Sequence, residues 1–127
     1  MFRQAITIYN RYENPDTGMD DYKRTVIDHA HWEATEGVNI GGIDFTTANT
    51  ISVVIPLKTG GYVEPNKYVG VGWTLKENDY IVRGKIDKEI KGYADLENES
   101  LKMVISSYEI NDYGRIGRLN NYTANGK

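Results

Sequence analysis

The sequence predicts an all-β protein, a small β-barrel or sandwich of about six strands with long loops. Three observations lead to this prediction. Short β-branched runs alternate in polarity with period two, and clusters of Gly, Pro, Asn and Asp separate them. No stretch keeps a helical period beyond a turn or two, which is typical of all-β domains. A closed barrel would also remove the exposed strand edges that invite aggregation.

The first hairpin is predicted from two strands and a strong turn. Gln4–Tyr9 alternates with Ile6 and Ile8 on one face, and the segment 22–33 reads as a second, longer strand. Between them, residues 14–18 combine Pro, which sets φ, with Asp, which bonds nearby backbone, and Gly, which accepts positive φ.

A third strand is predicted at 50–56, with alternate apolar residues facing inward. Pro56 cannot donate to a ladder, so this strand should end there or lie at an edge. The glycine-bearing stretch 35–49 before it and the stretch 58–67 after it are expected to be loops.

Three more strands are expected further along, at 69–75, 80–90 and 101–110. In 80–90, the clearest of them, Tyr80, Val82, Ile86 and Ile90 share one face, and Ile81 falls on the opposite, mostly charged face. Gly84 in its middle suggests a bulge or a close neighbour. These elements predict a single β-domain over residues 1–112 and a flexible basic C-terminal tail over 113–127.

The composition excludes several functions. Cys is absent from the 127 residues, which removes disulfides, thiolate metal sites and Cys nucleophiles. The apolar runs are too short to span a bilayer, so a soluble protein without membrane contact is expected. The net charge is −3 although residues 113–127 hold basic residues and no acid, so the body is acidic. An acidic body argues against sequence-specific DNA binding, which needs clustered cations.

No residue pattern predicts catalysis, a cofactor or a metal site, so we expect no enzyme. The sharpest alternative is His29, His31 and Glu33, which share one face of the predicted strand and could hold a metal. The simpler interpretation is a solvated strand face, with Ala30 and Trp32 packing inward. No Ser lies in a nucleophile context, so a hydrolytic triad is not expected.

Aromatic residues are the other candidates. Trp32 and Trp73 could form a stacking platform for sugars, but in strands they more often belong to the core. Tyr suits protein interfaces because it buries area and keeps a hydroxyl for a partner. The predicted interface residues are the loop tyrosines and the basic residues of the tail: Tyr62, Tyr68, Tyr93, Tyr113, Arg115 and Arg118.

The order of several segments resembles a family of structural proteins encoded in prophages of Gram-positive bacteria. The resemblance rests on the segments 6–12, 22–27 running into His31-Trp32, 51–56, 78–84 and 111–114, and it covers most of the chain. The layout is also similar to the head–tail connector (adaptor or stopper) proteins of long-tailed phages, in which such strands form a small barrel. The motifs are structural, and no catalytic residue is carried over.

The resemblance implies a virion component that is assembled in the bacterial cytoplasm. Its partners would be copies of itself in a homo-oligomeric ring, together with portal or tail proteins. The glycine-bearing loop would correspond to a stopper's channel-facing loop, formed here by Gly37, Asn39, Gly41, Gly42 and Asp44. A carbohydrate- or cell-surface-binding module, a minor capsid or tail protein and a small metal-dependent enzyme remain as alternatives.

Overall fold

The chain is an all-β protein, as predicted, and almost without helix. The computed structural model describes residues 4–35, 50–57, 59–99, 101–111 and 121–127. Within these ranges the strands are β1 (Gln4–Glu13), β2 (Asp20–Thr35), β3 (Thr50–Pro56), β4 (Tyr80–Arg83), β5 (Lys102–Asn111) and β6 (Asn121–Gly126). Two short 3-10 helices complete the elements: η1 (Pro65–Lys67) and η2 (Tyr93–Leu96).

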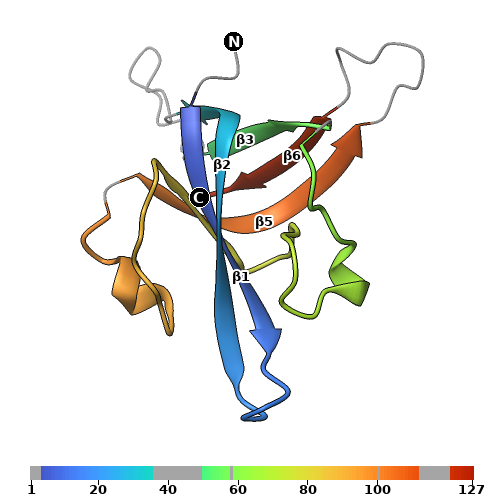
Figure 1. Cartoon of the computed structure of the whole chain (residues 1–127). Helices are drawn as coiled ribbons and strands as arrows, with labels where there is room; N and C mark the ends of the chain where they lie inside the picture. The colour runs from blue at the N-terminus through green and yellow to red at the C-terminus, as the bar shows by residue number, and fades with distance from the viewer. Residues whose placement is uncertain (1–3, 36–49, 58, 100, 112–120) are drawn as a thin grey trace.

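The six strands close into an antiparallel barrel in the order β1-β2-β3-β6-β5-β4 (Figure 1). The long strand β2 closes it by changing neighbours along its length. It pairs with β1 from Asp20 to Ala30 and with β3 from His31 to Thr35. A register shift between Ile27 and Ala30 marks a β-bulge, which bends a strand and increases its twist.

Two hydrophobic clusters lie on opposite faces of the wall formed by β1, β2 and β4. The barrel interior holds the larger cluster: Ile6, Ile8, Ile27, Ala30, Trp32, Val53, Ile55, Trp73, Leu75, Ile81, Met103, Ile105, Tyr122 and Ala124. On the outer face, Tyr9, Val82, Ile90 and Leu96 form a second cluster, because the segment after β4 folds back over the strands. The inward packing predicted for Ala30 and Trp32 is therefore confirmed.

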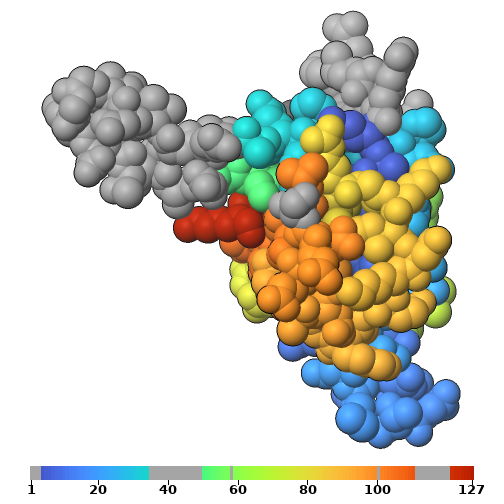
Figure 2. Space-filling model, turned by 90° about the vertical axis from the view of Figure 1, so that its left-hand side faces the viewer, coloured from blue at the N-terminus to red at the C-terminus, as the bar shows by residue number. Residues whose placement is uncertain are grey.

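The β1–β2 hairpin extends beyond the barrel as an arm (Figure 1), and Figure 2 shows its tip standing clear of the body. Its turn is the predicted one: Gly18 has φ 71°, and its N–H donates to the Asn14 carbonyl at 2.7 Å. The side chains that bond local backbone are those of Asn14, which accepts from the Asp16 N–H at 2.9 Å, and Thr17, which accepts from the Met19 N–H at 3.2 Å.

Two strand predictions are wrong, and glycines explain both. The segment 69–75 makes only a single bridge, between Trp73 and Tyr62, because Gly70 and Gly72 have φ of 90° and 77°. The strand predicted at 80–90 ends at Arg83, since Gly84 has φ 104° and turns the chain. Ile81, expected on a charged face, is fully buried in the barrel.

The tail prediction is wrong for residues 121–126. They form β6, which fills the gap between β3 and β5 and so closes the barrel. Its alternate residues Tyr122, Ala124 and Gly126 are buried. The sequence signal was weak because two of these inward positions are small: a Cβ on Gly126 would lie 1.9 Å from the Val104 carbonyl oxygen. The β-domain therefore does not end at residue 112.

Candidate functional site

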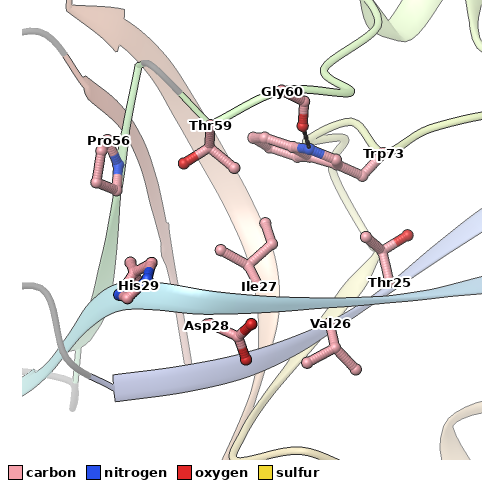
Figure 3. A pocket seen from close by; sticks show the side chains of 9 residues that line it. All are labelled: Thr25, Val26, Ile27, Asp28, His29, Pro56, Thr59, Gly60 and Trp73. Atoms are coloured by element: carbon pink, nitrogen blue, oxygen red, sulfur yellow. Dashed lines mark hydrogen bonds between the residues drawn. The ribbon is translucent and has the colours of Figure 1, made fainter.

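A pocket of about 370 Å³ opens in the barrel wall at the point where β2 and β3 separate. Thr25, Ile27 and His29 line it from β2, and Pro56, Thr59 and Gly60 line it from the end of β3 and the turn that follows. Figure 3 shows Ile27 and Trp73 at its apolar centre, with the Trp73 indole N–H donating to the Gly60 carbonyl at 2.9 Å.

Pro56 explains the opening. The β2–β3 ladder runs from Thr35 paired with Thr50 to His31 paired with Val54. The same register would place Ile55 opposite Ala30 and then Pro56 opposite His29, but proline has no N–H to donate. The chain instead turns, and the Thr59 N–H donates to the Pro56 carbonyl at 3.0 Å. The prediction that the strand ends at Pro56 is confirmed.

Asp28 and His29 both belong to the lining of the pocket, but the Asp28 carboxylate is turned away from its apolar centre. Asp28 lies on the opposite side of β2 from Ile27 (Figure 3). There it meets the Lys85 ammonium at 2.9 Å, and the hydrogen bond with Lys85 lowers the pKa of the Asp28 carboxyl. The polar groups left on the pocket side are hydroxyls and the exposed imidazole of His29. This arrangement suits an apolar contact and offers no nucleophile–base pair.

The metal alternative gains no support from the described residues. His31 and Glu33 approach to 4.0 Å, and both are exposed to solvent. In the part of the chain that the structure describes, no three His, Asp or Glu side chains come together as a metal site. The bulge before Ala30 also breaks the regular alternation from which the shared face was predicted.

The two tryptophans are core residues, with Trp73 2% and Trp32 6% exposed. Neither presents a ring face for stacking on a sugar. Tyr62 lies beside them: its ring stacks on Tyr122 at 4.4 Å and meets Trp73 edge-on at 5.1 Å. The predicted interface residue Tyr62 therefore has a packing role in the barrel.

The other described interface candidates differ in exposure. Tyr68 packs edge-on against Tyr12 and donates its hydroxyl to the Gly72 carbonyl, and burial raises its pKa to about 12. Tyr93, on η2, keeps 42% of its surface exposed, and its ring lies 5.2 Å from that of Tyr80. Two groups of candidates lie outside the described residues: Tyr113, Arg115 and Arg118 of the predicted tail, and Gly37, Asn39, Gly41, Gly42 and Asp44 of the predicted channel loop.

Sequence reasoning missed a buried polar network that ties the arm to the turn before β4. The Asn10 amide nitrogen donates to the Thr74 carbonyl at 2.8 Å and to Asp79 Oδ2 at 2.9 Å. Its oxygen accepts the Thr74 N–H at 3.0 Å, and Asp79 Oδ1 accepts the Arg11 N–H at 3.2 Å. The available signal was Asn10 itself, an amide on the inward face of a strand that also carries Ile6 and Ile8.

Replacing Asp79 with alanine is expected to lower the free energy of unfolding by about 2–3 kcal/mol, because the buried Asn10 amide and the partly buried Arg11 N–H lose their acceptor. Asp79 is 2% exposed, so water cannot replace the carboxylate without opening the site. Urea denaturation measures the loss. The neighbouring Glu77→Ala change, at an exposed acid, is the control and should stay within about 0.5 kcal/mol of the parent.

The loss of stability caused by Asp79→Ala should also depend on pH. Burial raises the pKa of Asp79 above its ordinary value of 3.8, opposed by the Asn10 hydrogen bond and by Lys76. A raised folded-state pKa adds stability below the unfolded pKa, and this is lost as pH rises through the folded pKa. The difference between parent and Asp79→Ala should therefore be larger in acid than at neutral pH. A difference that grows toward neutral pH would contradict the assignment.

No helix among the described residues is long and apolar enough to cross a membrane. No curated protein and no solved structure matches the chain. One family model does match, over residues 1–127, and it is described as a family of unknown function, DUF6751. Because this match covers the whole chain, the protein belongs to the DUF6751 family.

Proposed function

We propose that this protein is a structural subunit of a phage or prophage particle, a head–tail connector that acts in a ring between portal and tail. The proposal rests on the resemblance of segment order described above and on the physical character of the barrel. Its work would be mechanical: to join neighbouring rings and help to retain packaged DNA. It would be assembled in the bacterial cytoplasm and end as a virion component.

The observation that carries the proposal is the location of the exposed large apolar side chains. They lie on the arm, on the connections and on the outside of β5, while the barrel interior is filled by packed side chains. Among the described residues, those at least about a third exposed are Met19, Val69, Val71, Tyr93, Leu101, Tyr108 and Ile110. Exposed apolar residues outside a filled core favour function by surface contact with other proteins.

Val69 and Val71 form the most prominent such feature, which we call the valine tip. They are 70% and 72% exposed, and the intervening Gly70 sits so close to the Tyr12 ring that a Cβ there would lie 2.8 Å away. The close glycine fit fixes the loop against the arm, so the two valines are held outward on a supported backbone. A fixed apolar tip loses little entropy on docking.

The acidic balance of the chain fits the same role. A net charge of −3 would weaken the adhesion of DNA that passes through a ring of such subunits. A carbohydrate-binding module is less well supported, because both tryptophans that it would use are buried in the barrel. A minor capsid or tail protein would use the same kind of contact, and only the identity of the partner separates it from a connector.

The test is binding to a portal and a tail-completion protein from the genome that encodes this chain. We expect the protein to co-sediment with one of them and to form rings visible by electron microscopy. A Val69→Asp/Val71→Asp variant should lose binding, because it places charge on the valine tip. Lys67→Glu, a change at a nearby exposed residue, should retain it. A well-folded protein with no affinity for either partner would exclude the connector role, and binding to capsid or tail-tube protein would favour the alternative.

A further inference from the structure

The arm has an open strand edge. One edge of β2 pairs with β1 from Asp20 to Ile27, and the ladder with β3 on the other edge begins only at His31. Among the described residues, no backbone hydrogen bond joins the other edge of 20–29 to another strand. An open edge is a template for one more strand, either from another chain or from a second copy.

Backbone direction at Tyr22 shows which groups face outward. The Tyr22 N–H donates to the Asp21 carboxylate at 2.9 Å and not to β1. In an antiparallel strand the N–H and C=O of one residue point to the same side, so both groups of Tyr22 face the open edge. Two copies of β2 related by a two-fold axis at Tyr22 would exchange both of these bonds.

The charges around Tyr22 are self-complementary in that register. The sequence Asp20-Asp21-Tyr22-Lys23-Arg24 reads acid, acid, tyrosine, base, base. Antiparallel pairing about Tyr22 sets Asp21 opposite Lys23 and Asp20 opposite Arg24, twice over. A shift by one residue leaves half of these pairs, and a shift by two sets Asp21 or Lys23 opposite itself, which is unfavourable.

The same register places the apolar side chain of Met19 beside the pocket of the second copy. Met19, 70% exposed next to the turn of the arm, would lie opposite Thr25 of the second copy. Directly opposed residues in an antiparallel pair share a face, so Met19 would lie on the face of Thr25 and Ile27, which line the pocket. Charge and apolar pairing thus select one register independently.

The contacts within one chain leave this surface accessible. Asp20 and Lys23 are exposed, and no ion pair is found for either among the described residues. Arg24 lies 3.8–3.9 Å from the exposed acids Asp87 and Glu89, and Asp21 lies 3.6 Å from Lys91, which is 83% exposed. Arg24 also donates to the Ile86 carbonyl at 3.0 Å, and it and Asp21 are only 27% and 29% exposed, but their charged partners are exposed, so these ion pairs contribute little and can rearrange. Figure 2 shows the tip of the arm free of the rest of the molecule.

We propose that two copies of this protein associate through their arms, with β2 pairing antiparallel to β2 about Tyr22 and Met19 covering the partner's pocket. The contact is isologous, unlike the head-to-tail contact of a ring, so it does not depend on the connector role. The valine tip plays no part in it, and variants there distinguish the two proposals.

Sedimentation of the free protein tests the pairing, with a single chain of 14.4 kDa as the reference mass. At low salt we expect a concentration-dependent dimer that weakens as salt rises. Lys23→Glu should raise the dimer dissociation constant about tenfold, because it sets two acids opposite each other twice. Asp21→Lys should do the same, and the double variant Asp21→Lys/Lys23→Glu should restore the dimer. The matched control Lys67→Glu should leave it unchanged.

Every outcome of this experiment decides the question. Rescue by the double variant would establish the register, since an unrelated surface would not respond to a charge exchange between these positions. A protein that stays monomeric at every concentration would show that the charged residues of β2 only prevent strand pairing at the open edge. This result would overturn the proposal. A dimer indifferent to Lys23→Glu, or a double variant no better than the single ones, would overturn it as well. Circular dichroism confirms that each variant is folded.

Discussion

Deleting residues 121–127 is expected to abolish folding. This removes β6, the strand that pairs with β3 on one side and β5 on the other. Two open edges would result, and the barrel interior would lose the buried side chains of Tyr122 and Ala124. Tyr62 and Trp73 would both lose the ring that they pack against. The free energy of unfolding of a domain of this size is only about 5–15 kcal/mol, which such losses exceed or nearly exhaust.

Far-ultraviolet circular dichroism and hydrogen exchange measure this result. The shortened chain should lack cooperative unfolding and should aggregate through its exposed edges. Lys127→Ala is the control: its side chain is exposed, and the backbone bonds between residue 127 and Val104 remain, so it should unfold like the parent. A deletion variant as stable as the parent would mean that residues 121–127 are a dispensable tail after all.

Trp73→Ala is expected to lower the free energy of unfolding by about 3–5 kcal/mol, the usual cost of removing a large buried aromatic side chain. Trp73 is 2% exposed, meets Tyr62 and Tyr122 edge-on at 5.1 and 5.2 Å, and closes the pocket wall through its bond to Gly60. Neighbouring aromatic rings cannot collapse into the space without leaving their own contacts, so a cavity would remain.

Urea denaturation followed by circular dichroism measures the loss. Tyr93→Ala, at a half-exposed ring, is the matched control and should cost far less, because a ring in contact with water leaves no cavity. If Trp73→Ala unfolded like the parent but lost affinity for a glycan, the ring would be a binding platform, and the carbohydrate alternative would regain its place.

Local chemistry made part of this structure predictable. Residues 4–9 and 50–56 carry apolar residues at period-two positions, residues 14–18 hold turn-forming residues, and Pro56 lacks an N–H. Each signal acts within a few residues, and each prediction was confirmed. Tyr80, Val82, Ile86 and Ile90 were predicted to share one face of a single strand. They do share a cluster, although the chain reaches it by turning at Gly84 and not by continuing a strand.

Other features depend on partners that are distant in sequence. Asn121–Gly126 has weak strand propensity, yet it is a barrel strand because β3 and β5 leave between them a slot of unpaired backbone groups and little space for side chains. Tertiary context overrides local preference in such a slot. The same holds for the network of Asn10 and Asp79, which joins residues far apart in the chain.

The amino-acid order alone was enough to establish the class of fold, the first hairpin and the end of β3, because period, turn chemistry and a missing N–H act locally. Long-range pairing settled three other points. It assigned the C-terminal segment to the barrel, buried both tryptophans, and left the outer edge of β2 open above an apolar pocket. Which strands become neighbours depends on how the barrel closes, and no short stretch of sequence contains that information.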